Sequence, residues 1–409
     1  MSQIDQSRQA GPSEPPIVST AALDADPHAL FRHHRALTPL IKREDGAYVV
    51  IRAGDVERLA TDPRTRQLET ELVQSRGVTE GALFDFFKYG MLTSNGSDHH
   101  RRRAPLSRAF ASRLIAELRP RIRATAERLI DNAYRQGEMN LLDQFAAVLP
   151  ATIISEILGL PEADLPRFTG WVYQFARVFS ASFAHEDAAQ IETAARHLTD
   201  YVSELLASRR TAPSGDFLTS YAIAVAQEGN LSPIETLIQI VTVILAGSDT
   251  TRAGMTILVA LLLRHRDQWD AVCRDPALIP GAVSEALRFE PPVGSFPRVT
   301  LEDLGVDGYR VPRGRILSIS TLSAMRDPAL YAEPDVFNIR RTDHPRRHLV
   351  FGAGAHRCLG EALARVELEE GLAALVQRLP QLELVGAPPT IHGHAGIRRV
   401  DAMQVGWSR

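Results

Sequence analysis

Cysteine is scarce in this sequence: its 409 residues include only two, Cys273 and Cys358. Two thiols cannot build a disulfide scaffold, and the absence of a C-x-x-C pair excludes the common zinc sites. Two thiols on a chain of this length are typical of a protein from a reducing compartment. We therefore expect a cytoplasmic protein in which each cysteine needs its own explanation.

The sequence also lacks an excess of charge of either sign and a targeting segment. Its 46 basic and 49 acidic residues leave a net charge of −3, which gives no reason to expect nucleic acid or an anionic membrane as partner. Residues 1–16 are polar and rich in Pro and Ser; we expect them to be disordered, followed by a single domain over 17–409. The longest apolar stretch, 237–263, contains Asp249 and Arg252. It therefore predicts a buried helix rather than a membrane anchor, and we expect a monomer.

Helical periodicity predicts a mainly α fold with a small β-rich part. Apolar residues recur three and four apart over most of 98–288, and two β-prone runs flank an Asp-Gly turn within 40–51. A second hairpin is predicted near 306–319. Ser232, Pro233 and Glu235 form a capping box that begins a helix of about 32 residues, which ends near Arg264.

The middle of that long helix, Ala246-Gly247-Ser248-Asp249-Thr250-Thr251, is a poor helix sequence. Glycine alone costs about 1 kcal/mol there relative to alanine. The segment is either a polar helix face in contact with water or a functional site where a local rule is broken.

A glycine-rich segment, Phe351 to Gly360, surrounds Cys358. It lacks the glycine of a dinucleotide fingerprint at Arg357 and the Lys-Ser/Thr pair of a phosphate loop, and His356 with Cys358 offers only two zinc ligands. One interpretation is a turn that leads into a helix, with Cys358 as an apolar filler. The other is a thiolate stabilised at a helix N-terminus, with glycines that let the backbone approach a flat ligand such as haem.

These residues resemble the signatures of the cytochrome P-450 family. Phe351, Gly354, Cys358 and Gly360 match the haem-binding pattern F-x-x-G-x-x-x-C-x-G at every fixed position. Other segments match in family order and spacing from about residue 30 onwards: the E-x-x-R pair, the arginine that follows it, the oxygen-activation motif and the H-x-x-x-R pair. Their residues are Glu285 with Arg288, Arg341, Ala246 to Thr251, and His99 with Arg103.

The resemblance implies the cytochrome P-450 fold, in which a long central helix lies over haem b and Cys358 is the axial metal ligand. It implies that Asp249 and Thr250 are catalytic and deliver protons to dioxygen, while Gly247 loosens the helix to make room for it. Glu285, Arg288 and Arg341 are implied to form a structural ion-pair core. The implied cofactor-binding residues are His99, Arg103, Arg298, His356, Cys358, Phe351, Gly352, Gly360, Ala246 and Gly247. The first four of these are implied to serve as cations for the haem propionates.

By the same resemblance, the chain is expected to be a monooxygenase that oxidises an apolar small molecule. No flavin or iron–sulfur signature occurs in the sequence, so ferredoxin and ferredoxin reductase are the expected electron donors. Two further readings stay open: a peroxide-driven peroxygenase, which the Asp249-Thr250 pair disfavours, and a non-catalytic haem ligand sensor. Arginines predicted to dock an acidic carrier are Arg101, Arg102, Arg108, Arg346, Arg347 and Arg357. The predicted substrate pocket consists of Phe86, Phe87, Val243, Val293, Gly294 and Phe296.

Overall fold

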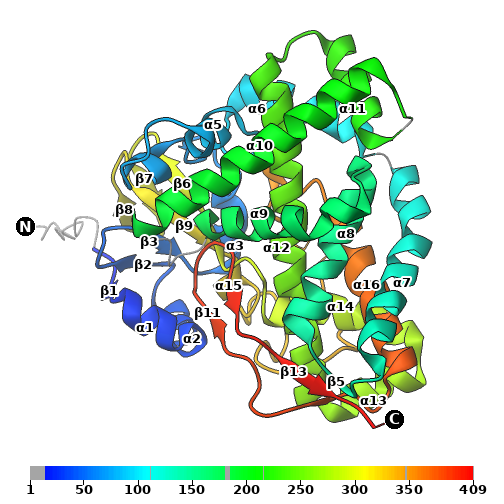
Figure 1. Cartoon of the computed structure of the whole chain (residues 1–409). Coiled ribbons are helices and arrows are strands. Elements are labelled where there is room, and N and C mark those ends of the chain that lie inside the picture. Colours follow the sequence, from blue (N-terminus) through cyan, green and yellow to red (C-terminus); the bar gives the residue numbers. More distant parts are fainter. Residues whose placement is uncertain (1–13, 111, 180–184, 215, 346–347, 409) are drawn as a thin grey trace, which may run out of the picture.

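The computed structural model describes residues 14–110, 112–179, 185–214, 216–345 and 348–408. Helices dominate these residues; most strands gather on the left in Figure 1, and β5 (Glu138–Asn140) and β13 (Gln404–Gly406) lie apart from them near the C-terminus. The predicted fold class, mainly α with a small β part, is confirmed. Of the segment predicted to be disordered, residues 1–13 lie outside the described residues, and Pro16 already accepts a hydrogen bond from the Lys42 backbone N–H at 2.9 Å.

The longer helices are listed here by their bounds: α2 (Pro27–Leu37), α5 (Ala82–Tyr89), α6 (Gly96–Ala109), α7 (Ser112–Tyr134), α8 (Val148–Leu158), α9 (Leu165–Ala176), α10 (Ala188–Thr211), α11 (Phe217–Glu228), α12 (Pro233–Arg264), α13 (Arg266–Arg274), α14 (Ile279–Phe289) and α16 (Glu361–Arg378). Shorter helices are α1 (Thr20–Ala25), α3 (Ala53–Leu59), α4 (Glu71–Gln74) and α15 (Thr321–Ala324).

The largest sheet has the strand order β1-β2-β3-β9-β6-β4. The predicted hairpin within 40–51 is confirmed as antiparallel β2 and β3, and β3 pairs in parallel with β9, Tyr48 opposite Leu317. The second predicted hairpin is confirmed as β7 and β8. The strand bounds are β1 (Ile17–Val18), β2 (Leu40–Arg43), β3 (Tyr48–Val50), β4 (Thr65–Arg66), β5 (Glu138–Asn140), β6 (Ser295–Thr300), β7 (Leu304–Val306), β8 (Tyr309–Val311), β9 (Ile316–Ser320), β10 (Glu383–Leu384), β11 (Ile391–His392), β12 (Arg399–Val400) and β13 (Gln404–Gly406).

Helix α12 crosses the molecule and is buried over most of its length, as predicted (Figure 1). Its capping box is formed: the Glu235 backbone N–H donates to Ser232 Oγ, and the Ser232 backbone N–H donates to the Glu235 carboxylate. Helices α8, α9, α10, α14 and α16 pack around it. Buried leucines such as Leu258 and Leu262 each contribute about 1.5–3 kcal/mol to this core.

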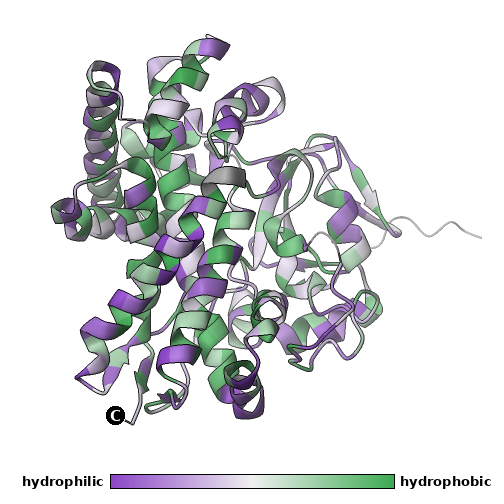
Figure 2. Cartoon of the chain, turned by 90° about the vertical axis from the view of Figure 1, so that its right-hand side faces the viewer, coloured by the Kyte–Doolittle hydropathy of each residue, from purple (hydrophilic) through white to green (hydrophobic). Residues whose placement is uncertain are grey.

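Hydrophilic residues are spread over the helices in view in Figure 2, rather than being confined to their ends. Across the described ranges, no helix combines the length and the low polarity that a membrane span requires.

Candidate functional site

The loop before α16 carries Cys358 and is shaped by hydrogen bonds of its own backbone. The Cys358 N–H donates to the Phe351 carbonyl at 2.8 Å, and the Arg357 N–H donates to Gly354 at 3.1 Å. Gly352 and Gly354 have φ angles of +72° and +62°, a region that other residues rarely adopt, and a Cβ on Gly354 would lie 2.7 Å from Thr61 Cγ2. The loop therefore needs these two glycines, and it leaves Cys358 exposed.

The electrostatics of Cys358 suit a metal ligand. Although solvent reaches part of the Cys358 side chain, the protein atoms around its sulfur desolvate the thiol and raise its pKa, against the opposing effects of the Gly360 backbone N–H and of Arg103 and Arg357. The predicted stabilisation of the thiolate by backbone N–H groups is thus present, but it lowers the thiol pKa by less than desolvation raises it. A bound cation would be needed to make the thiolate the stable form. In the described part of the chain no three His, Cys, Asp or Glu side chains gather as a metal site. One axial thiolate fits haem, since the porphyrin supplies the other ligands of its iron.

A hollow of about 200 Å³ lies beside this loop and could hold an anionic group. The guanidinium of Arg298 lies in its lining, where it donates to Gln67 Oε1 at 2.5 Å and to the Ala60 carbonyl at 3.0 Å. Burial lowers the pKa of Arg298 to about 10, which keeps it charged at neutral pH. The Arg298 guanidinium carbon also lies 4.9 Å from the centre of the Phe296 ring. A carboxylate in this hollow would meet a buried and positioned cation.

The two predicted propionate histidines, His99 and His356, stack on each other with ring centroids 3.9 Å apart. Burial first, and neighbouring arginines and histidines second, lower the pKa of His99 to about 4 and that of His356 to about 3. These shifts favour neutral rings, which offer N–H donors, and the role of both residues toward the propionates stays a prediction. Arg103 from α6 donates to the Arg357 carbonyl at 2.7 Å and so ties α6 to the cysteine loop.

Helix α12 presents an open face at the unusual segment found in the sequence. Ala246 is exposed and Gly247 and Thr250 are half-exposed, whereas Ser248, Asp249 and Thr251 are buried. The predicted loosening of the helix is wrong: α12 is unbroken. The Ser248 and Thr250 hydroxyls donate to the carbonyls four residues earlier, at 2.8 and 3.0 Å, and so satisfy their hydrogen bonds without interrupting the helix.

Helix α16 places the cysteine loop near this open face. Glu367 of α16 bonds to Thr251 of α12, and a Cβ on Gly254 would lie 3.7 Å from Leu368. At 1.5 Å per residue, α16 begins about 9 Å before Glu367. The loop with Cys358 thus continues into the helix that packs against the turn of α12 containing Thr251.

The predicted ion-pair residues come together in the core. Glu285 and Arg288 are fully buried and joined by two hydrogen bonds of 2.7 and 2.8 Å, and Arg341 Nε lies 3.2 Å from Glu285 Oε2. Arg288 also donates to three backbone carbonyls of the segment 325–336. A charge network of this kind anchors irregular chain behind the cysteine loop, because every buried charge has a partner.

The predicted substrate residues are not all open to one space. Phe86 and Phe87 are buried with Phe175 and Phe179 in an aromatic cluster, with ring centroids 5.1 to 6.0 Å apart. Val243 and Gly294 are buried, and a Cβ on Gly294 would collide with the His394 carbonyl at 2.6 Å. Position 294 therefore requires glycine, because the backbone at His394 passes too close to leave room for a side chain. The remaining two, Val293 and Phe296, are half-buried.

The predicted arginine docking patch is largely neutralised. Arg102 is buried, so its assignment to the surface is wrong; it shares Glu235 with Arg101, which lies 2.5 Å from that carboxylate. Arg108 pairs with Glu228 and Arg357 with Glu361, each at 2.6 Å. Arg346 and Arg347 lie outside the described residues. The sequence shows the arginines but not the carboxylates that the fold brings to them.

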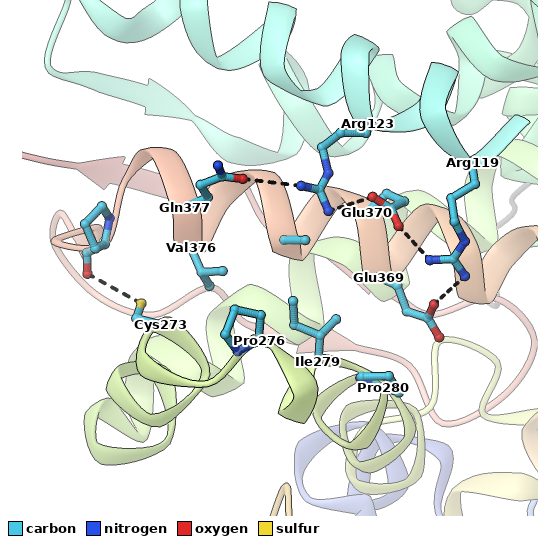
Figure 3. Close-up of a pocket in the computed structure, with 12 residues that line it drawn as sticks. Arg119, Arg123, Cys273, Pro276, Ile279, Pro280, Glu369, Glu370, Val376 and Gln377 are labelled. Atoms are coloured by element: carbon cyan, nitrogen blue, oxygen red, sulfur yellow. Dashed lines mark hydrogen bonds and ion pairs between the residues drawn. The ribbon is translucent and has the colours of Figure 1, made fainter.

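A groove of about 580 Å³ lies elsewhere, between α7, α16 and the start of α14 (Figure 3). Arg119 contacts both Glu369 and Glu370 at 2.8 and 2.6 Å, and Arg123 contacts Glu370 at 2.6 Å. Cys273 is half-buried at its edge, 3.9 Å from the Pro380 carbonyl, and burial raises the pKa of its thiol. The charges drawn in Figure 3 satisfy one another, and we assign no function to this groove.

Sequence reasoning missed three side chains next to the site. Glu367 is fully buried and burial raises its pKa to about 8, and Gln67 binds Arg298. Tyr173 of α9 lies against Arg252. Only Glu367 left a signal, because it falls on the helix face shared by Leu363 and Ala374, which periodicity predicts to be apolar.

Comparison with known proteins gives one answer throughout. The sequence model of the family described as cytochrome P-450 matches residues 277–396. The plant-inducible cytochrome P-450 pinF1 of Rhizobium radiobacter is 45% identical over 98% of this chain and 94% of its own length. The cytochrome P-450 monooxygenase PikC of Streptomyces venezuelae is 32% identical over 99% of this chain and 97% of its own. The crystal structure of CalO2 superposes with a TM-score of 0.87 at 29% identity and covers 95% of this chain and 97% of that one.

Proposed function

The chain belongs to the cytochrome P-450 family of monooxygenases, and from this premise we propose that it binds haem b through Cys358. With the haem bound, it inserts one atom of dioxygen into an apolar small organic molecule. The electrons come from a ferredoxin-type partner and its reductase. The observation that carries the proposal is the exposed Cys358, held by a glycine-dependent loop beside the buried cation Arg298.

The haem, when bound, supplies dioxygen binding and activation at its iron. The chain's own side chains would bind and orient it: Cys358 through sulfur, and Arg298 and Arg103 through their charge on the propionates. His99 and His356 would add neutral N–H donors. Gly360 would donate its backbone N–H to the thiolate, and the Phe351 carbonyl accepts the Cys358 N–H and so fixes the loop.

On the opposite face, Ala246 would leave room because it is exposed and lacks a bulky side chain, whereas Gly247 allows Ile154 of α8 to approach the helix closely. Thr250 would present its hydroxyl to dioxygen and hold a proton there, and Asp249 would link that hydroxyl to solvent. The partial exposure of Thr250 supports its role toward dioxygen, and the burial of Asp249 supports its role as the link behind that hydroxyl. It also favours reduction of dioxygen over a peroxide-driven reaction, which needs no such proton supply.

Half-buried apolar side chains support an apolar substrate: Val293 and Phe296 lie on the strand side. The electron donor must be a separate protein, because the sequence contains no flavin or iron–sulfur signature. Arg101 and Arg102 would contribute little positive charge to the surface that binds this donor, because both form ion pairs with Glu235.

The test is the spectrum of the reduced carbon monoxide adduct of the purified protein and of Cys358→Ser. We expect the Soret band of a thiolate ligand in the wild type and its loss in the variant. A histidine-type band in the wild type, or an unchanged band in Cys358→Ser, would overturn the proposal. A screen of apolar compounds for displacement of the water ligand in the ferric protein then identifies the substrate class.

A further inference from the structure

Gln67 lies beside Arg298 because their strands pair. In the antiparallel ladder of β4 and β6, Arg66 is opposite Val299, so Gln67, one residue further along, comes opposite Arg298. Side chains at opposite positions of a ladder lie on the same face of the sheet. Both residues line the hollow of about 200 Å³ beside the cysteine loop. The fold thus places an amide and a guanidinium side by side at a space that is large enough for a carboxylate.

Arg298 determines which way the Gln67 amide is turned. A guanidinium can only donate hydrogen bonds, so the amide must present its oxygen to it, and Gln67 Oε1 accepts from Arg298 Nη1 at 2.5 Å. The hydrogen-bond network therefore assigns the amide nitrogen, Nε2, to the other side. This nitrogen donates to no protein atom within the described ranges. Its two N–H groups are thus available to a ligand.

Asn95 fixes the backbone that carries this amide. The Gln67 backbone N–H donates to Asn95 Oδ1 at 2.8 Å, and Asn95 Nδ2 donates to the Gln67 carbonyl at 3.3 Å. Asn95 is the N-cap residue of α6, yet its side chain makes no cap hydrogen bond to that helix. Capping normally stabilises a helix, so here the side chain serves Gln67 instead. The amide is therefore held from two sides, by the residue that begins α6 and by Arg298.

Arg298 brings an uncompensated positive charge to the hollow. Its hydrogen bonds all go to neutral acceptors, and no acidic side chain of the described residues pairs with it. Two other charged residues of the lining are already paired, Asp62 with Arg64 at 2.7 Å and Arg66 with Glu71. The ligand that suits this hollow is therefore an anion with oxygen acceptors, and a carboxylate can accept from the guanidinium and the amide at once.

We propose that Gln67 is a further binding residue for the haem: its Nε2 group donates a hydrogen bond to the propionate that Arg298 attracts. The inference rests on the proposed function in one respect, namely that haem is the ligand of the cysteine loop. A neutral amide suits this place better than a carboxylate, because it supports the guanidinium without cancelling its charge. None of the sequence signatures matched above includes position 67, so this residue is found only from the pairing of β4 with β6.

The experiment measures the propionate bending band of the ferric holoenzyme by resonance Raman spectroscopy, because this band falls in frequency when a propionate loses a hydrogen bond. The variant Gln67→Glu keeps an oxygen for Arg298 but loses both N–H groups and adds a negative charge. We expect the band to shift down. Haem transfer to excess apomyoglobin should become at least about tenfold faster, the usual effect of losing a hydrogen bond to a charged group. Gln74→Glu, the same change at an exposed position of α4, is the matched control and should leave both measurements unchanged.

Should Gln67→Glu fail to retain haem, Gln67→Met makes the same test, because methionine has a similar length, no N–H group and no added charge. A wild-type propionate band in the holoenzyme of the variant overturns the inference even where haem loss is faster, since faster loss alone reflects a structural role. The carbon monoxide adduct separates this failure from that of the proposed function. A thiolate band in the wild type with an unmoved propionate band in the variant refutes the role of Gln67 alone, whereas a wild type without the thiolate band refutes haem ligation by Cys358.

Discussion

Glu367 makes the pH dependence of stability a direct test of the packing between α12 and α16. Its side chain is fully buried, burial raises its pKa to about 8, and a hydrogen bond from Thr251 opposes that rise only in part. One carboxylate oxygen, Oε1, has no hydrogen-bond partner among the described residues. The folded protein therefore holds this carboxyl in its protonated form at neutral pH.

The sign and size of the effect follow from linkage. Between the usual glutamate pKa of 4.5 and about 8, the folded state binds a proton that the unfolded state releases. The stabilisation is therefore fully present below the lower pKa and is lost as pH rises through the upper one. The shift of about 3.5 units corresponds to at most about 5 kcal/mol at 1.36 kcal/mol per unit. An unfolding entropy of about 2.1 cal/mol/K per residue over this chain converts that loss to about 6 °C in Tm for the whole shift, of which about 5 °C falls between about pH 5 and about pH 8.

The assay compares Tm of the wild type with Tm of Glu367→Gln from about pH 5 to about pH 8. Glutamine has the same shape and never ionises, so the wild type should lose up to about 5 °C relative to the variant as pH rises. Glu369→Gln, on the same helix at the surface ion pair with Arg119, retains Glu367 and should follow the wild type. Parallel curves for wild type and Glu367→Gln would refute the assignment of a neutral buried carboxyl.

Three further predictions concern the core and the site. Glu285→Gln leaves the fully buried Arg288 without its counter-ion and should cost about 3–5 kcal/mol in denaturant unfolding; a loss under about 1 kcal/mol would show that the pair is dispensable. Gly247→Ala adds a Cβ that would lie 2.8 Å from Ile154 Cδ1, so stability should fall, and adding Ile154→Val, which removes that methyl group, should restore it; additive losses in the double variant would contradict this. Thr250→Ala should keep substrate binding but divert electrons from product to hydrogen peroxide, measured by peroxide release per electron, whereas a haem sensor predicts no such change.

The sequence predicts well what depends on local pattern. The capping box at Ser232, the hairpin within 40–51 and the long helix to Arg264 are all found, because caps, turns and periodicity act over a few residues. The glycine-rich cysteine loop was predictable for the same reason, since positive φ angles at Gly352 and Gly354 demand glycine.

Partners of charged side chains were not predictable, because they come from distant parts of the chain. Arg102 looked like a surface cation, but the fold brings Glu235 to it from 133 residues away, and it becomes part of a buried network. Likewise His99 and His356 looked like cations, but burial of the two stacked rings lowers the pKa of both and favours their neutral forms. Sequence shows which groups can carry charge, and burial decides whether they do.

Asp249 and Glu367 show how this matters for chemistry. Both are carboxyls in or beside the same turn of α12, and burial raises the pKa of each. Arg252 opposes the shift at Asp249, whereas Glu367 has only the neutral Thr251 hydroxyl. Arg252 thus opposes at Asp249 the desolvation that keeps the Glu367 carboxyl neutral where it packs α12 against α16. Because Arg252 comes from the same helix but its guanidinium lies against Tyr173 of α9, the difference between the two carboxyls depends on how α9 packs against α12.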